Sequence, residues 1–542
     1  MAPSTQLLHP AEARILICDE LAAAAIEDFR KRGFEPEIAL GLSEDELVEK
    51  IIGFHAAIVR SATKITKRVL EAADELRVVG RAGVGVDNVD CETATKLGIV
   101  VMNTPTGNTT TTGELAVALI CSLARHVATG NRRVRAGTWS KKGLLGTELT
   151  GKRIGVVGLG RIGRVVADRC LGLHMEVVAH DPYLQGLGKK SPIDGVELID
   201  LDELIQSSDF ITLHVPLLDS TRNLLSRERL ESTRPGVRII NAARGGLIDE
   251  EALADLLDSG HIAGAALDVL AQEPPAADHP LVNRENVLIT PHLGASSHEA
   301  QFNVAVDIAR QIGDFLAEGV AHNAVNAPAV SATTLKQIAP YVLLAEKIGS
   351  FLAQSMDEPI RKLEVTLSGQ AVGEGKGYLP LSILVGSLRR TVAGVNYVNA
   401  PLIAKDNGIR LLEGSDEESY AFQDLIKVRA SSRGGEMSHV VCGTVFGSNP
   451  RLVRVDDLHL DLDPTGCILI TTHNDQPGVI GDVGTILGEA GVNIRRMELG
   501  SGEQRNQDRA MGFLSLDCVP DSGTMTTIND LKAIEHTRLI EL

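Results

Sequence analysis

The strongest constraint on the fold is the segment 154–163, in which a run of apolar residues leads into three glycines. This pattern is typical of a buried parallel strand that passes through a tight turn into a helix. Gly158 permits the turn, Gly160 lets the backbone approach a ligand, and Gly163 allows the helix to pack closely on the strand. The helix N-terminus offers unpaired N–H groups and a positive dipole end to a diphosphate. The segment therefore predicts a dinucleotide site in an α/β fold.

A second predicted strand, residues 176–179, leads to Asp181, which follows Gly163 at about the 20-residue spacing of a ribose-binding acid. Its carboxylate can accept a hydrogen bond from a ribose hydroxyl and would repel a 2′-phosphate. The next residues are Pro182 and Tyr183, so no Arg stands there to receive such a phosphate. We therefore predict NAD, not NADP, as the cofactor.

Length and composition limit the classes of function. A chain of 542 residues is too long for one core, so three or four domains are expected. The formal net charge of −18 argues against nucleic acid or an anionic membrane as a general partner. Seven scattered cysteines without a CxxC pair indicate reduced, mostly buried thiols and no metal site. Residues 1–12 do not resemble a secretory signal, and no long apolar run follows, so we predict a cytoplasmic protein.

Apolar strands alternate with amphipathic helices along the first part of the chain, which predicts parallel sheets. The first set of strands lies near residues 15–18, 56–59, 78–79 and 100–102, and a second set near 210–213, 237–240, 265–267 and 287–290. Between the sets, a capping box at residues 111–114 is predicted to open a helix that ends at Ala124. A helix over residues 298–318 and a linker over 323–329 close this part of the chain.

The end of the chain shows a βαββαβ order, which is typical of a ferredoxin-like domain. Its predicted elements are strands 467–472, 492–499, 511–516 and 539–542 and helices 479–490 and 527–534. The whole chain is predicted to be α/β, with two Rossmann-like parallel-sheet lobes around a cleft, an α+β intervening domain and this ferredoxin-like domain. The expected domains are residues 1–106 with 299–327 returning to them, 107–298, 328–464 and 465–542.

Three segments of the second lobe place ionisable residues directly after apolar strands, where parallel sheets position functional groups. They supply a cation, Arg244, the carboxylates Asp268 and Glu273, and an imidazole, His292. Any one of them alone is as readily explained as a solvated loop residue. Together they match the oxidation of a secondary alcohol by hydride transfer, in which a base must take the hydroxyl proton. A carboxylate beside the imidazole would orient it, and an Arg can grip a substrate carboxylate.

These motifs resemble the D-2-hydroxyacid dehydrogenase family, with the closest match over residues 80–297. The resemblance implies that His292 is the acid/base, Glu273 its partner and Arg244 the substrate anchor. It also implies NAD contacts from the glycine turn and from Arg161, Ile162, Asp181, Ala242, Asp268, Gly294 and Ala295.

The resemblance extends to the long members of the family and implies oxidation of 3-phospho-D-glycerate to 3-phosphohydroxypyruvate, the first step of L-serine biosynthesis. Arg60 and Ser61 follow a predicted strand and form a plausible phosphate cradle, although a solvated loop explains them equally well. The family pattern adds Arg81 and Asn108 to the substrate site. It also implies a homodimer or homotetramer in which Trp139 crosses an interface and Lys141 reaches a neighbour's phosphate.

The terminal domain resembles an ACT domain, a small-molecule regulatory module. This implies feedback control by an effector such as L-serine at His473, Asp475 and Asn493. Some relatives carry Asn where this chain carries Asp475. Two alternatives remain open: a glyoxylate or hydroxypyruvate reductase would need neither the phosphate cradle nor the long segment after Ala327, and an NADH-sensing transcriptional corepressor of the same fold would lack the ACT unit.

Overall fold

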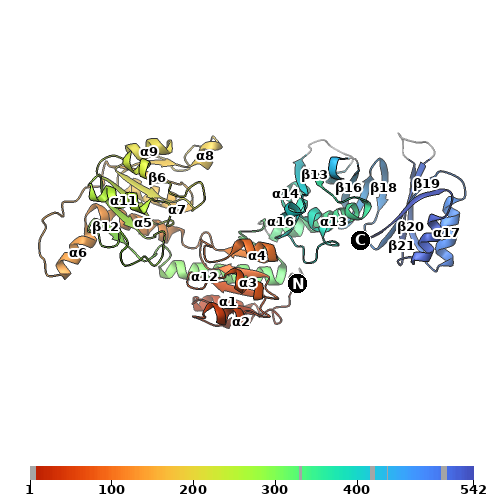
Figure 1. Ribbon diagram of the computed structural model, residues 1–542, viewed down its shortest axis with the longest axis horizontal. Coiled ribbons are helices and arrows are strands. Elements are labelled where there is room, and N and C mark those ends of the chain that lie inside the picture. The colour runs from red at the N-terminus through yellow and green to blue at the C-terminus, as the bar shows by residue number, and fades with distance from the viewer. Residues whose placement is uncertain (1–7, 189, 329–331, 416–421, 436, 502–508) are drawn as a thin grey trace.

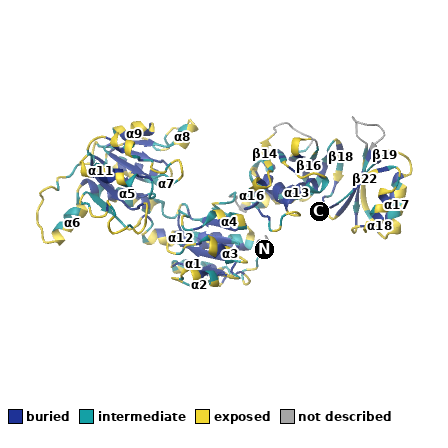
Figure 2. Cartoon of the chain, viewed as in Figure 1, coloured by how far each residue is buried: buried dark blue, intermediate teal, exposed yellow. Residues whose placement is uncertain are grey.

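The computed structural model describes residues 8–188, 190–328, 332–415, 422–435, 437–501 and 509–542. Within these residues the chain folds into four β-sheets flanked by helices. In Figure 1 the first sheet lies between the second, at the left, and the third and fourth, at the right. Figure 2 shows that the buried residues gather between the helices and strands of each layer.

The first sheet is fully parallel, in the order β2-β1-β3-β4-β5. Ile15 and Ile17 of β1 face one hydrophobic core, and Leu16 between them faces another. Burial on both faces explains why these strands read as continuous apolar runs. The elements are β1 (Ile15–Ile17), α1 (Ala23–Lys31), β2 (Glu37–Ile38), α2 (Glu44–Lys50), β3 (Ala56–Val59), α3 (Lys67–Ala72), β4 (Val78–Arg81), α4 (Cys91–Leu97) and β5 (Val100–Asn103).

One long helix, α12 (His298–Glu318), brings the chain back from the second sheet to this one. α12 buries Val304, Ile308 and Ile312 in the same core as β1, as its amphipathic pattern requires. The predicted linker after it is not free: Asn326 accepts a hydrogen bond from the Val101 N–H at 2.9 Å, and Val325 donates to the Val101 carbonyl. Ala329, the last residue of that linker, lies outside the described residues.

The second sheet is also parallel, in the order β12-β11-β10-β9-β6-β7-β8, with helices on both faces. All its strands point their carboxyl ends toward one edge, where ligands bind in such folds. The elements are α5 (Thr109–Ala124), α6 (Val127–Arg135), β6 (Arg153–Val157), α7 (Arg161–Gly172), β7 (Glu176–His180), α8 (Pro182–Gly186), β8 (Val196–Leu198), α9 (Leu201–Ser207), β9 (Phe210–Leu213), α10 (Arg227–Glu231), β10 (Val237–Asn241), α11 (Glu250–Asp258), β11 (Ile262–Leu267) and β12 (Val287–Ile289).

The third sheet has the order β14-β13-β15-β16-β17-β18, and helices cover one of its faces. Its elements are α13 (Ala332–Ser355), β13 (Lys362–Ser368), α14 (Gln370–Glu374), α15 (Tyr378–Leu388), α16 (Ala400–Asp406), β14 (Arg410–Ser415), β15 (Leu425–Ser431), η1 (Arg433–Gly435), β16 (Ser438–Phe446), β17 (Asn449–Val455) and β18 (Leu458–Leu462).

The fourth sheet has the order β20-β21-β19-β22 and belongs to a βαββαβ unit, as predicted. Ile468, Ile470 and Phe513 on its open face share one hydrophobic core with the third sheet and α13, so the two C-terminal units pack as one body. The elements are β19 (Cys467–Asn474), α17 (Val479–Glu489), β20 (Ile494–Ser501), β21 (Arg509–Leu516), α18 (Ser522–Asn529) and β22 (Ile534–Glu541).

Several predicted elements were wrong in detail. The last helix begins earlier than predicted because Asp521 caps it, accepting from the Thr524 N–H at 2.7 Å. The helix ends at Asn529, residues 530–533 form a turn, and β22 begins at Ile534. The capping box at residues 111–114 does not form. α5 already begins at Thr109, and the hydroxyl of Thr111, the expected cap, lies 3.0 Å from the Ser297 hydroxyl instead. The short edge strands β2 and β8 were not predicted.

The structure also bears on the remaining composition arguments. All seven cysteines are free; Cys18, Cys170, Cys442 and Cys467 are buried and Cys518 is exposed. Within the described ranges, no helix has the length and apolar character needed to span a bilayer. The same residues contain no cluster of His, Cys, Asp and Glu that could hold a metal ion.

Candidate active site

A cavity of about 560 Å³ lies between the first two sheets. Residues from both lobes line it, so neither lobe forms the site alone. The predicted residues that it brings together are Arg60, Ser61, Arg81, Asn108, Arg161, Ile162, Ala242, Arg244, Asp268, Glu273, His292, Gly294 and Ala295.

The imidazole and carboxylate predicted to act together are in contact. His292 Nδ1 lies 2.8 Å from Glu273 Oε2, and Glu273 Oε1 accepts from the Leu270 N–H at 3.2 Å. Because Nδ1 is occupied by the carboxylate, Nε2 is the ring atom left to face a substrate. His292 has a φ of +53°, in the left-handed region that L residues seldom adopt. Contacts from other segments of the chain must therefore hold the His292 loop in this conformation.

Asp268 holds that loop. It is 1% exposed, and its Oδ1 accepts from the Leu293 N–H at 2.7 Å and from the Thr290 hydroxyl at 2.6 Å. Its Oδ2 accepts from the Gly294 N–H at 2.8 Å. A carboxylate oxygen has room for two hydrogen bonds, so Oδ2 keeps one acceptor position toward the cavity. Asp268, predicted as an NAD contact, thus anchors the His292 loop in addition to lining the cavity.

Arg244 is held by both lobes. In the second lobe its Nη1 donates to the Ala243 carbonyl at 2.7 Å, and Asn241 Nδ2 donates to the Arg244 carbonyl at 2.8 Å. From the first lobe, Asp87 Oδ2 lies 3.3 Å from Arg244 Nε. The planar guanidinium is therefore oriented before any substrate binds, which favours a two-point grip on a carboxylate.

The first lobe adds two more cations to the same cavity. Burial, with Arg244 nearby, lowers the pKa of Arg81 to about 10, which still leaves it charged at neutral pH. Arg81 Nε is buried without a hydrogen-bond partner among the described residues. Arg60 is positioned through its backbone, since its N–H donates to Asp19 Oδ2 and its carbonyl accepts from Asn88. Such a cluster of cations favours a substrate with more than one negative charge.

The glycine turn fits a dinucleotide. Gly158 has a φ of +93°, and a Cβ there would lie 2.6 Å from the His214 carbonyl oxygen, so only glycine fits. A Cβ on Gly163 would clash with the Gly158 carbonyl, whereas Gly160 faces open space. No side chain caps α7, which leaves the N–H groups of its first turn available to a diphosphate.

Asp181 lies at the end of β7 beside this turn. Its Oδ2 accepts from the Leu159 N–H at 3.0 Å, and its Oδ1 caps α8 by accepting from the Tyr183 and Leu184 N–H groups, each at 3.1 Å. The carboxylate predicted to bind the ribose is thus hydrogen-bonded to the glycine turn predicted to bind the diphosphate.

Lys141 is not part of this cavity in its own chain. It follows α6 on an arm that extends from the second sheet, at the left of Figure 1, and α6 buries none of its residues. Trp139 on the same arm is 90% exposed and Leu145 93% exposed.

The predicted effector residues do not form one site within the chain. His473 is 3% exposed, with its Nε2 buried and without a described partner, while Asp475 is exposed beyond the end of β19. Asn493 precedes β20 instead of lying on it. β19 and β20 both pair antiparallel with β21, so they run in the same direction, and Asn493 and Asp475 lie at opposite ends of the sheet. At about 3.3 Å per residue, the strand between them spans roughly 25 Å.

Sequence reasoning missed three residues that shape the cavity. Asp87 orients Arg244, and Thr112 ties α5 to the His292 loop. His214 lines the cavity behind the glycine turn, where burial lowers its pKa to about 4 and keeps the ring neutral. None of these three residues carries a local signal of its role in the sequence.

Comparison with known proteins agrees with this geometry. The NAD-binding domain of the D-isomer specific 2-hydroxyacid dehydrogenases matches residues 117–294, the D-3-phosphoglycerate dehydrogenase intervening domain matches 337–456, and the ACT domain matches 468–533. A D-3-phosphoglycerate dehydrogenase of Archaeoglobus fulgidus is 38% identical over 531 residues, which cover 98% of this chain and 100% of the relative. The chain belongs to the D-3-phosphoglycerate dehydrogenase family.

Some relatives match nearly the whole chain, whereas others match little more than half of it. A D-3-phosphoglycerate dehydrogenase of Synechocystis is 39% identical over 534 residues, covering 98% of this chain and 95% of the relative. The crystal structure of a glyoxylate reductase from Paecilomyces thermophila superposes with a TM-score of 0.52 at 28% identity, and covers 99% of that chain but only 58% of this one. The reductase alternative therefore lacks a counterpart for much of this chain, whereas members of the D-3-phosphoglycerate dehydrogenase family match nearly all of it. The ACT match also contradicts the corepressor alternative.

Proposed function

We propose that 3-phospho-D-glycerate is oxidised in the cavity between the lobes, where His292 is the acid/base, Glu273 is its partner and Arg244 is the substrate anchor. The activity is the NAD-dependent one of the D-3-phosphoglycerate dehydrogenase family, and it begins L-serine biosynthesis. One observation carries the assignment of roles: the His292–Glu273 pair shares one cavity with Arg60, Arg81 and Arg244, and the first residues of α7 line the same cavity.

Each residue has a defined part in the reaction. Arg244 binds the substrate carboxylate and orients the hydroxyl at the adjacent carbon. His292 Nε2 takes the hydroxyl proton, and Glu273 on Nδ1 stabilises the imidazolium that results. In the reverse direction Arg244 polarises the carbonyl oxygen while His292 returns the proton. NAD, when bound on the glycine turn, supplies the hydride acceptor.

The phosphate is assigned to Arg60 and Ser61, with Arg81 and Asn108 completing the substrate site. Asn108 Oδ1 is buried without a described partner, so it can accept a hydrogen bond from a substrate hydroxyl. On this assignment the Arg60 side chain contributes to the binding of a phosphorylated hydroxy acid but not to that of an unphosphorylated one.

Arg60→Gln tests the proposed function directly. The variant is expected to raise KM for 3-phospho-D-glycerate roughly ten- to a hundredfold, the effect of losing one charge-assisted hydrogen bond. KM for D-glycerate should change little, because D-glycerate has no phosphate to lose. Lys64→Gln, an exposed cation on the same loop that does not line the cavity, is the matched control. Equal changes in both KM values would refute the phosphate role.

Asp181→Asn is expected to relax the preference for NAD. Asn retains a side-chain oxygen to cap α8 but removes the charge that repels a 2′-phosphate. The ratio of kcat/KM for NADP to that for NAD should rise roughly tenfold. Asp194→Ala removes an exposed acid of the same lobe and should leave the ratio unchanged. An unaltered ratio in Asp181→Asn would remove Asp181 from the ribose site.

The exposed arm supports assembly as a homodimer or homotetramer. The arm exposes 90% of the Trp139 side chain and 93% of Leu145, and large apolar side chains left in water are typical of a surface that a second subunit covers. Such a contact carries Lys141 toward the neighbour's substrate phosphate. Sedimentation of the full chain should show a homo-oligomer that Trp139→Ala weakens, and a monomeric parent chain would exclude the shared site.

L-serine is proposed as the effector of the ACT domain. Asp475 can bind its ammonium group, and the uncapped N-terminus of α17 can bind its carboxylate. Because Asn493 lies at the other end of the sheet, it can contribute only from a second ACT domain paired head to tail. The buried His473 ring supports the end of β19 and is not open to solvent.

Calorimetry with L-serine tests this site on the full chain. Asp475→Ala is expected to weaken binding roughly tenfold or more, since it removes a charged partner. Glu489→Ala, at the other end of α17, should bind as the parent chain does. If the parent chain gives no heat of binding with L-serine, the ACT domain has a role in assembly alone. If Asp475→Ala binds L-serine as tightly as the parent chain, the effector site does not include Asp475.

A further inference from the structure

The unit built on the third sheet is docked on the first lobe at the corner between α4 and β5. Figure 1 shows α16 and α4 at this junction. Asn396 Nδ2 donates to the Gly98 carbonyl at 2.8 Å, and Val398 is buried in the hydrophobic core that β1 and α12 share. Gly98 has a φ of +74°, and a Cβ at this position would clash with the Asn396 side chain. The corner therefore fits Asn396 closely.

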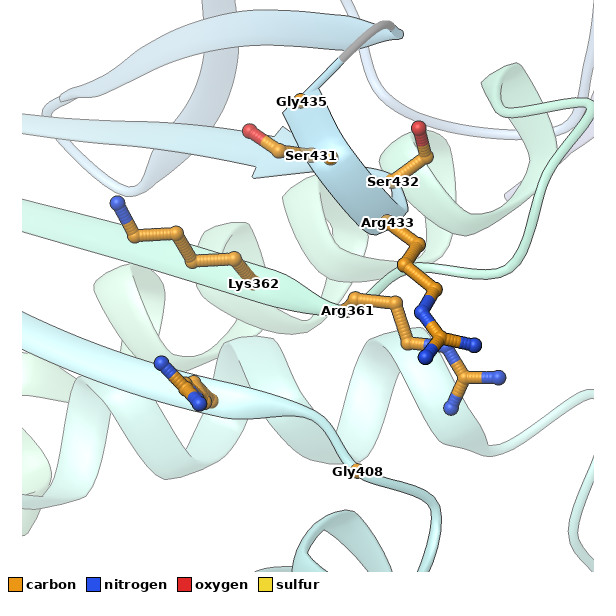
Figure 3. Close-up of a pocket in the computed structure, with 9 residues that line it drawn as sticks. Arg361, Lys362, Gly408, Ser431, Ser432, Arg433 and Gly435 are labelled. Carbon is orange, nitrogen blue, oxygen red and sulfur yellow. The ribbon is translucent and has the colours of Figure 1, made fainter.

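The docking side chain is held in place by its own unit. Asn396 is 8% exposed, and its Oδ1 accepts from the Val398 N–H at 2.9 Å. α16 follows this turn, and its far end is fixed because the Arg361 guanidinium donates to the Asn407 carbonyl. Figure 3 shows Arg361, which directly precedes β13, and Gly408, which lies just beyond α16. The amide of Asn396 is thus oriented by contacts other than the one with the first lobe.

Tyr397, which stands between the two docking residues, connects them to the helices of the third-sheet unit. Its ring stacks on Tyr378 of α15 with the centroids 4.8 Å apart, and its hydroxyl donates to Glu346 of α13. Glu346 also pairs with Arg389 at 2.8 Å. The docking turn is therefore fixed to two helices, and it moves together with the whole unit.

α4 connects this corner to residues 60–65, the Arg60 loop. The helix has seven residues and spans roughly 10 Å, so its two ends move together. Just before α4, Asn88 Nδ2 donates to the Arg60 carbonyl at 2.8 Å and to the Thr63 carbonyl at 2.6 Å. The Ile65 N–H donates to the Asn88 carbonyl at 2.8 Å. A displacement of the far end of α4 is therefore transmitted to the Arg60 loop.

We propose that Asn396 is a positioning residue for the substrate phosphate, which acts on the Arg60 loop through α4 and Asn88. The proposal rests on the proposed function, in which Arg60 binds that phosphate. Asn396 does not line the active-site cavity, so its effect on substrate passes through other residues. While the contact with Gly98 holds, α4 and Asn88 keep the Arg60 loop in one position. Once this contact is lost, the phosphate must order the loop as it binds, which weakens binding.

Asn396→Asp in the full chain tests the role of the amide donor. Asp keeps an oxygen that accepts from the Val398 and Asn399 N–H groups. It replaces the Nδ2 donor with a second carboxylate oxygen, which repels the Gly98 carbonyl. KM for 3-phospho-D-glycerate is expected to rise roughly three- to tenfold, the effect of one hydrogen bond, while kcat stays nearly unchanged. KM for D-glycerate should change little, because D-glycerate has no phosphate.

The matched control is Asn449→Asp, the same change at an exposed asparagine of β17 in the third-sheet unit, which should leave both KM values unchanged. Val398→Ala removes part of the same docking contact and serves if Asn396→Asp fails to fold. An equal rise in both KM values would show a general structural role for the contact. That result, or unchanged KM values in a folded variant, would overturn the proposal.

A double-mutant cycle shows whether Asn396 acts through Arg60. In the Arg60→Gln background, Asn396→Asp should raise KM for 3-phospho-D-glycerate by less than about twofold, because the side chain that it positions is gone. Additive effects would place the action of Asn396 elsewhere and contradict the proposal. The same variants separate the two proposals. If Arg60→Gln affects both substrates equally, the proposed function fails, whereas a selective Arg60→Gln beside an ineffective Asn396→Asp contradicts the positioning role alone.

Discussion

His292→Ala is expected to lower kcat by roughly 10² to 10⁴, the usual contribution of a positioned acid/base. The imidazole is half exposed in the cavity, and its Nδ1 is held by Glu273 at 2.8 Å, so Nε2 is the available proton acceptor. NADH affinity should be nearly unchanged, because the glycine turn and Asp181 lie on a different part of the site. Steady-state kinetics with 3-phospho-D-glycerate and a fluorescence titration with NADH measure the two quantities.

The matched control is His298→Ala, an exposed histidine six positions along the chain that does not line the cavity. It should retain the parent kcat. Glu273→Gln provides an intermediate case, since Gln keeps a hydrogen bond to the ring but removes the charge that stabilises the imidazolium. Near-normal turnover in His292→Ala would show that His292 is not the acid/base. Loss of NADH binding in the same variant would indicate a structural defect instead.

Arg244→Gln is expected to lower kcat/KM for 3-phospho-D-glycerate by roughly 10² to 10³, comparable to the loss of a charge-stabilising donor in other enzymes. Two effects combine: the carboxylate loses a two-point partner, and the developing carbonyl oxygen loses a cation. Asp87 on the first lobe also loses its ion pair with Arg244 Nε, so the variant weakens a contact between the lobes.

Two comparisons separate these effects. Arg222→Gln changes an exposed arginine of the same lobe outside the cavity and should behave as the parent enzyme. Asp87→Asn breaks the contact between the lobes but leaves Arg244 in place, so it should reduce kcat/KM by less than Arg244→Gln does. If Asp87→Asn lowers kcat/KM as much as Arg244→Gln does, then Arg244 acts by holding the two lobes together and not by binding the substrate.

The sequence by itself determined the features that depend on short-range pattern. The glycine turn at residues 158–163 and the acid at Asp181 are local, because one strand, one turn and one helix build them. The boundaries of α12 were predicted correctly for a related reason: the amphipathic period and the capping Ser297 lie within the helix itself or directly before it. The meeting of Arg244, Glu273 and His292 was also predictable, since the ends of parallel strands share one edge.

Tertiary structure alone decided the contacts between distant segments. The role of Asp87 toward Arg244 and that of Thr112 toward Gly294 bridge more than a hundred residues, and neither residue differs locally from an ordinary loop or helix residue. The shared core of the two C-terminal sheets depends on which face of β19 remains uncovered by its own helices, and alternation along the strand does not specify the partner. Strand pairing likewise brings Arg410 beside Lys362 at one end of the third sheet, although the two residues are far apart in sequence.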